Sequence, residues 1–224
     1  MIPRVSADRS LAWFGPFAVF VAWLAIDSML PIANPGKEVL RDVVLLASIV
    51  IFSREVLPRR APHALLSVAL GLGVFVLWIA PDLLFSGWRA SARFQNSVTG
   101  HLKTSIPPTE LTPVMLALRT MRAALLVPVI EELFWRGWLA RWLQDTKFTN
   151  IPLGTFTPLA FWGTAALFAM EHGPFWEVGL VCGIIYNWWM KRTRSLGDLI
   201  LVHAVTNLAL SVYVIMTGRW TFWM

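Results

Sequence analysis

Long apolar runs separated by short polar segments extend along the chain. The pattern predicts seven helices, at about 11–31, 39–57, 63–85, 112–143, 155–172, 174–190 and 196–217. A helix that spans a bilayer needs about 20 mostly apolar residues, and several of these runs are long enough. The pattern therefore predicts an all-α fold, a polytopic transmembrane bundle of seven to eight helices.

The composition supports the same class of protein. Of the 224 residues, 57% are hydrophobic and 14% are charged, whereas soluble domains carry roughly 25% charged residues. No polar linker is long enough to join two domains. We therefore expect one integral-membrane domain over residues 1–224, in contact with the lipid bilayer.

One stretch, 86–111, is neither fully apolar nor a plain loop. Its basic and aromatic residues are followed by two consecutive prolines, and it contains Trp88, Arg89, Arg93, His101, Lys103, Pro107 and Pro108. Such a composition is typical of a short amphipathic helix that lies on the membrane surface. This stretch could hold the eighth helix.

The net charge of +6 would suggest nucleic-acid binding in a soluble protein. Here the basic residues cluster between apolar runs, at 54–60 and 191–194, which is typical of cytoplasmic loops of membrane proteins. We expect no nucleic-acid partner. With the N-terminus inside, ten Lys and Arg fall in inner segments and eight in outer ones, which favours a cytoplasmic N-terminus.

Three charged side chains interrupt the apolar run 112–143: Glu131, Glu132 and Arg136. Each would cost about 2.5–3.5 kcal/mol at the centre of a membrane helix unless it faces other helices or water. Glu132 and Arg136 are four residues apart and share a helix face, so we expect them to pair. Glu131 is rotated by about 100° and points elsewhere. Pro128 removes a backbone donor and is expected to kink the helix nearby.

Polar pairs also occur on two other predicted helices. Glu171 and His172 end one of them, and His203 and Asn207 lie one turn apart on the last. Each pair has a structural reading: the histidine at a helix end would be interfacial, and the others would hydrogen-bond across helices. The Glu132–Arg136 pair could likewise only hold helices together. The convergence of polar residues on three helices nevertheless favours a functional site.

These residue types suit hydrolysis by water. Glu131, among apolar side chains, could act as a general base with His172 beside it, while His203 and Asn207 could donate hydrogen bonds to an oxyanion. A zinc site of Glu131, His172 and His203 is the alternative, but there is no H-E-x-x-H motif. We therefore expect no cofactor. The single cysteine, Cys182, has no histidine or acid near it in sequence and is interpreted as a packing residue.

Three motifs, each on its own predicted helix, resemble those of the CPBP family of intramembrane proteases. They are E-E-x-x-x-R at 131–136, F-x-x-x-H at 168–172 and H-x-x-x-N at 203–207. That family includes Ras-converting CAAX endopeptidases and bacterial abortive-infection or bacteriocin-immunity homologues. The resemblance covers about residues 110–217.

The resemblance implies a CAAX-type endopeptidase of the glutamic class. In it, Glu131 and His172 would activate water, and His203 and Asn207 would form the oxyanion hole. Glu132 and Arg136 would support the first carboxylate. Glu171 is an additional acid that the general pattern does not require. Older descriptions of the family as metalloproteases keep zinc as an alternative.

The sequence around the motifs, including "PLGTFT" and "HAVTNLALSVYVIMTGRWTFW", resembles a bacterial subgroup called CAAX prenyl protease-related. That subgroup is associated with exosortase systems. This implies a multi-pass protein of the bacterial inner (cytoplasmic) membrane whose substrate is a membrane-associated protein or peptide. The farnesylated substrate of eukaryotic members is not implied. The alternatives are a non-catalytic adaptor or immunity protein on the same scaffold, and a transporter with Glu131 as proton relay, against which the lack of an internal repeat counts.

Overall fold

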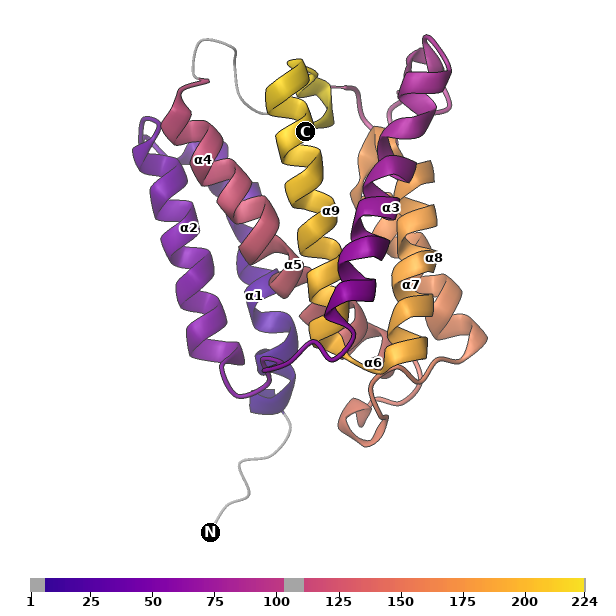
Figure 1. Cartoon of the computed structure of the whole chain (residues 1–224). Helices are drawn as coiled ribbons and strands as arrows, with labels where there is room; N and C mark the ends of the chain where they lie inside the picture. The colour runs from indigo at the N-terminus through magenta and orange to yellow at the C-terminus, as the bar shows by residue number, and fades with distance from the viewer. Residues whose placement is uncertain (1–6, 103–110, 224) are drawn as a thin grey trace.

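The computed structural model describes residues 7–102 and 111–223, and within them the chain is helical with no strand, which confirms the all-α bundle. Seven helical segments run up and down between the two ends of the bundle (Figure 1). They are α1 Ala7–Ile26, α2 Gly36–Ser48, α3 Ala64–Leu84, the segment Pro113–Trp142 that contains α4 to α6, α7 Pro158–Glu171, α8 Trp176–Thr193 and α9 Leu196–Thr217.

Four segments of the described chain are long and apolar enough to cross a membrane: Ser10–Met29, Ala64–Leu84, Pro113–Trp142 and Leu196–Thr217. Large apolar side chains such as Leu65 and Met216 lie exposed on the outside of the bundle, where lipid would cover them. The protein is therefore an integral membrane protein. α7 has 14 residues and is about 21 Å long, which is shorter than a hydrocarbon core of about 30 Å.

Local sequence signals explain where three of these helices begin. The hydroxyl groups of Thr112, Thr157 and Ser195 each accept a hydrogen bond from a backbone N–H in the first turn of α4, α7 and α9. These are typical N-caps, which satisfy donors that have no partner inside the helix. Proline follows both threonines, and it is well tolerated at a first helical position because its missing N–H would be unpaired there.

The segment Pro113–Trp142 is not a regular α-helix. α4 Pro113–Met121, α5 Val127–Glu132 and α6 Ala140–Trp142 are joined by two wider, π-helical stretches, Arg122–Leu126 and Leu133–Leu139. Pro128 has no N–H to donate to the carbonyl four residues back, so the ladder is interrupted there. The distortion predicted near Pro128 takes this form, and both carboxylates lie on the short α5 between the wide stretches.

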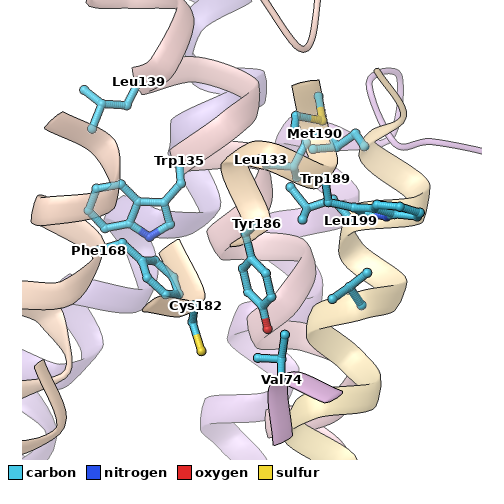
Figure 2. Close-up of a cluster of buried hydrophobic side chains, with 12 residues drawn as sticks. Val74, Leu133, Trp135, Leu139, Phe168, Cys182, Tyr186, Trp189, Met190 and Leu199 are labelled. Atoms are coloured by element: carbon cyan, nitrogen blue, oxygen red, sulfur yellow. The ribbon is translucent and has the colours of Figure 1, made fainter. Parts of the chain in front are cut away.

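An apolar cluster of buried side chains from α3, α7, α8, α9 and the stretch Leu133–Leu139 holds the bundle together; ten of them are labelled in Figure 2. Gly183 of α8 lies close to α7, since a Cβ at this position would be 3.0 Å from the Cα of Ala165. A larger residue would push these two helices apart. The cluster includes Phe168, Cys182 and Tyr186, and the buried Cys182 packs there as expected from the sequence.

The amphipathic helix expected within 86–111 is absent from the described part of that segment, 86–102. This part contains a single 3-10 turn, Trp88–Ala90, and one isolated bridge between Asn96 and Gly100. Gly87 and Gly100 adopt positive φ values of 73° and 79°, which break a helical path. Arg89 points into the protein and is buried, so the segment has no continuous polar face. Residues 103–110 lie outside the described residues.

Candidate active site

A cavity of about 500 Å³ lies within the bundle and brings the polar residues of three helices together. Glu131 of α5, the neighbours Glu171 and His172 at the end of α7, and His203 and Asn207 of α9 all line it. Aromatic and apolar side chains form much of the remaining wall, among them Phe20, Trp78, Phe168, Phe175, Tyr186 and Leu210. The cavity therefore combines an apolar lining with a small group of polar side chains, as ligand and active sites commonly do.

Glu132 and Arg136 lie behind this wall and pair as their spacing predicts. The Nη1 atom of Arg136 is 3.1 and 3.0 Å from the two carboxylate oxygens of Glu132. The other guanidinium donors bind the side-chain oxygen of Asn187 at 2.8 Å and the carbonyl of Gly183 at 3.3 Å. Both members of the pair are fully buried, and a buried charge is tolerated only when it is compensated in this way.

Glu131 differs from Glu132 in having no such partner. Its side chain is buried at 6% exposure, and its Oε2 atom accepts no hydrogen bond from any residue that the structure describes. The nearest cationic or imidazole nitrogen recorded for it is Nε2 of His203, at 4.0 Å. This separation is too long for a direct hydrogen bond but suits two groups that share one water molecule.

Hydrogen bonds orient both histidine rings. Nδ1 of His172 lies 2.7 Å from the carbonyl oxygen of Phe168. A carbonyl oxygen only accepts, so Nδ1 carries the proton, and Nε2 is the acceptor when the ring is neutral. Nδ1 of His203 lies 2.9 Å from Oε1 of Glu132, which leaves Nε2 on the side of Glu131. Each ring thus keeps one nitrogen for a ligand.

Asn207 is held by the helix segment that carries Glu131. Its Nδ2 atom donates to the carbonyl of Ala123 at 2.9 Å, within the π-helical stretch Arg122–Leu126. A side-chain amide has two N–H donors, so this bond leaves one of them for another acceptor. Asn207 therefore both connects α9 to its neighbour and lines the cavity.

The structure also places three arginines on the cavity wall that sequence reasoning did not assign to the site, namely Arg41, Arg119 and Arg122. Arg122 is buried and bridges to Glu38 at 2.6 Å and to Asp42 at 2.8 Å. The carboxylates come from α2, so two segments far apart in sequence are paired here. The four-residue spacing of Glu38 and Asp42, at the start of the predicted helix 39–57, was the only sequence signal for this contact, and it did not identify the partner.

Asn187 is a second residue that sequence reasoning missed. It is fully buried on α8, accepts from Nε of Arg136, and donates to the carbonyl of Phe161 at 2.7 Å and the hydroxyl of Thr164 at 2.9 Å. An asparagine within the apolar run 174–190 could have indicated a contact between helices. Its role in orienting Arg136 depends on packing that no short motif records.

A metal site was the alternative for the same residues. Within residues 7–102 and 111–223 there is no group of three or more His, Cys, Asp or Glu side chains arranged to hold a metal ion. Zinc with Glu131, His172 and His203 therefore remains a question for experiment, and no geometry in the described residues supports it.

Comparison with known proteins finds a family match for part of the chain. Residues 113–209 match the family described as type II CAAX prenyl endopeptidase Rce1-like. No curated protein and no solved structure matches the chain. The matched segment begins at α4 and ends within α9, so it contains every polar residue named above on α5, α7 and α9. Residues 113–209 of this chain are thus similar to the Rce1-like type II CAAX prenyl endopeptidases, which are peptide hydrolases.

Proposed function

We propose that this protein is a glutamic-type intramembrane endopeptidase that hydrolyses a peptide bond of a membrane-associated protein. The observation that supports this most directly is the position of Glu131. Its Oε2 atom is buried on the cavity wall without a hydrogen-bond partner among the described residues, and it lies 4.0 Å from Nε2 of His203. An unpaired carboxylate inside a membrane protein is costly, so its presence indicates a functional residue.

In this mechanism Glu131 takes a proton from a water molecule, with His172 helping to hold that water through Nε2. The water oxygen attacks the carbonyl carbon, and the C=O electron pair moves to the oxygen. His203, when both ring nitrogens are protonated, and Asn207 donate hydrogen bonds to this oxyanion. The proton held by Glu131 passes to the amide nitrogen as the C–N bond breaks, which leaves a carboxylic acid and an amine and restores the Glu131 carboxylate.

The other residues of the site support these roles. Glu132 accepts from Nδ1 of His203 and from Arg136, so it fixes the ring orientation of a proposed oxyanion donor. Glu171 lines the cavity beside His172 and is a second carboxylate that could exchange protons with solvent. The proposed association with exosortase systems stays a prediction from the wider sequence.

The activity can be tested by comparing the proteomes of a bacterial host with and without the gene. A catalytic protein should produce a membrane-associated protein with a new terminus, and this terminus should disappear in a Glu131→Gln strain that makes normal amounts of the protein. An adaptor or immunity protein on the same scaffold would give no new terminus. Function that survives Glu131→Gln would likewise contradict the proposed mechanism.

We also propose that the protein lies in the bacterial inner membrane with its N-terminus in the cytoplasm. The basic segments 54–60 and 191–194 lie at the end of the bundle where α1 begins, and Figure 1 shows the C-terminus at the opposite end. Arg41 of α2 and Trp223 near the C-terminus line the cavity. The cavity then extends toward the outer face of the membrane, and the substrate would approach from that side.

Labelling of introduced cysteines tests this orientation. In a Cys182→Ala background, a cysteine at the exposed Ser91 should react with a membrane-impermeant maleimide in intact spheroplasts. A cysteine at the exposed Arg59, at the opposite end of the bundle, should react only after the membrane is permeabilised. The reverse pattern would place the N-terminus outside.

Metal content gives an independent test of the mechanism. We expect purified protein to contain much less than one zinc per chain and to keep its activity in a chelator that leaves the detergent intact. Zinc at one per chain, with activity lost on removal and restored on re-addition, would instead make Glu131, His172 and His203 metal ligands. That result would replace the glutamic mechanism.

A further inference from the structure

Arg89 is the most completely bonded arginine in the described chain outside the proposed site. Its side chain is 3% exposed, and all of its N–H groups find acceptors. Nε and Nη2 bind the carboxylate of Asp82 at 2.9 and 2.6 Å, and Nη1 and Nη2 bind that of Glu177 at 3.0 and 2.6 Å. Nη1 also donates to the carbonyl of Pro174 at 2.5 Å.

These bonds connect three separate parts of the fold. Asp82 lies near the end of α3, Glu177 lies in the first turn of α8, and Pro174 belongs to the short turn Gly173–Phe175. This turn directly follows His172. Burial disfavours the guanidinium charge, but the hydrogen bonds to Asp82 and Glu177 outweigh it and raise the pKa of Arg89 above its ordinary value. Arg89 therefore stays protonated and holds Asp82, Glu177 and the Pro174 carbonyl together, an arrangement called the Arg89 clamp below.

Two sets of contacts connect Arg89 with the ring of His172. The first is the backbone, because the N–H of Phe175 donates to the carbonyl of His172 at 2.9 Å and closes the turn that Arg89 holds through Pro174. The second is a series of rings. The guanidinium lies 3.9 Å from the ring centroid of Phe175, which stacks on Trp78, and Trp78 lies 5.2 Å from the ring of His172.

We infer that Arg89 is a positioning residue for His172, and that the segment 86–102 thereby contributes to the active site. This inference rests on the proposed function, in which Nε2 of His172 holds the attacking water. Arg89 and Asp82 lie outside the matched residues 113–209. Their partners Glu177 and Pro174 lie inside the match, so these contacts join the matched segment to a part of the chain outside it.

The central test is Arg89→Lys, which keeps the charge but cannot bind two carboxylates and a carbonyl in one plane. We expect the turnover number to fall by about ten- to a hundredfold, since small misplacements of a catalytic group have effects of this size, while KM changes by less than about threefold. Arg93→Gln is the matched control, because Arg93 lies on the same segment, is exposed and forms no recorded ion pair. It should behave as the unmodified protein.

A double-mutant cycle separates positioning from a structural role. In a His172→Gln background, Arg89→Lys should change the remaining turnover by less than about twofold, because the group that it positions is already gone. An equal loss in both backgrounds would contradict the inference. If Arg89→Lys lowers the yield of folded protein, Asp82→Asn is the second variant, since it weakens the clamp while Glu177 and the Pro174 carbonyl still bind Arg89.

A measurement without substrate keeps this test independent of the proposed activity. In protein labelled with ¹⁵N-histidine, Arg89→Lys should shift the imidazole resonance of His172 and leave that of His63, at the other end of α3, unchanged. An unchanged His172 resonance would overturn the inference. A shifted resonance in a protein that cleaves nothing would uphold the positioning and reject the proposed function.

Discussion

Glu131→Gln should remove peptide cleavage while leaving the protein folded. The amide has the shape of the carboxylate but cannot take a proton from water, and loss of a general base lowers turnover by about 10²–10⁴-fold. Stability should change little, because Oε2 accepts no hydrogen bond from the described residues. The measurement is turnover on a fluorogenic peptide together with the melting temperature in detergent.

Glu132→Gln is the informative comparison, since it makes the same chemical change one residue away. Glu132 is fully buried and accepts from both Arg136 and His203. Its loss leaves the charge of Arg136 poorly compensated, which costs on the order of 3–5 kcal/mol when a buried pair is broken. We therefore expect both a lower melting temperature and lower activity. Purely catalytic losses of equal size in the two variants would contradict this division of roles.

Asn207→Ala should lower turnover by about a hundred- to a thousandfold. A donor to a developing oxyanion is worth about 2.7–4 kcal/mol in the transition state and much less in the ground state, so the apparent KM should change only a few-fold. Asn207→Asp should be at least as damaging, because an acceptor replaces the donor. Steady-state kinetics on the same peptide measures both variants.

The contact between Asn207 and Ala123 supplies the competing explanation. The amide donates to this carbonyl at 2.9 Å, so Asn207 could act only by holding α9 against the neighbouring segment. In that case Asn207→Ala would lower the free energy of unfolding by about 1 kcal/mol, the contribution of one hydrogen bond, and with it the melting temperature, while turnover would stay normal. A normal turnover number with reduced stability would remove Asn207 from the active site.

The approach of a substrate is also constrained by the described residues. The cavity wall combines apolar and aromatic side chains with three arginines, of which Arg122 is paired with the α2 carboxylates Glu38 and Asp42. Under the proposed function, an apolar segment of a membrane-associated protein would fit against the apolar side chains of this wall. Four wall residues come from α1, α2 and α3, namely Phe20, Leu24, Arg41 and Trp78, so segments outside residues 113–209 also line the cavity.

The sequence alone was sufficient for the helices and for the ion pair. Runs of apolar residues predicted all seven helices, because membrane and core helices both depend on local composition and length. The four-residue spacing predicted the Glu132–Arg136 contact, because residues one turn apart are neighbours on any helix. The motifs on three helices also indicated the kind of family that residues 113–209 match, since each motif is short and continuous in sequence.

Contacts between distant segments were decided by the tertiary structure. Whether Glu131 has a partner, which nitrogen of His203 faces it, and where Asn207 donates all depend on how α5, α7 and α9 are placed relative to one another. The sequence predicted an amphipathic helix around Arg89, whereas this side chain is buried between α3 and α8. Local periodicity describes one helix at a time, but a buried charge is positioned by partners from other helices, and the packing of the whole bundle selects them.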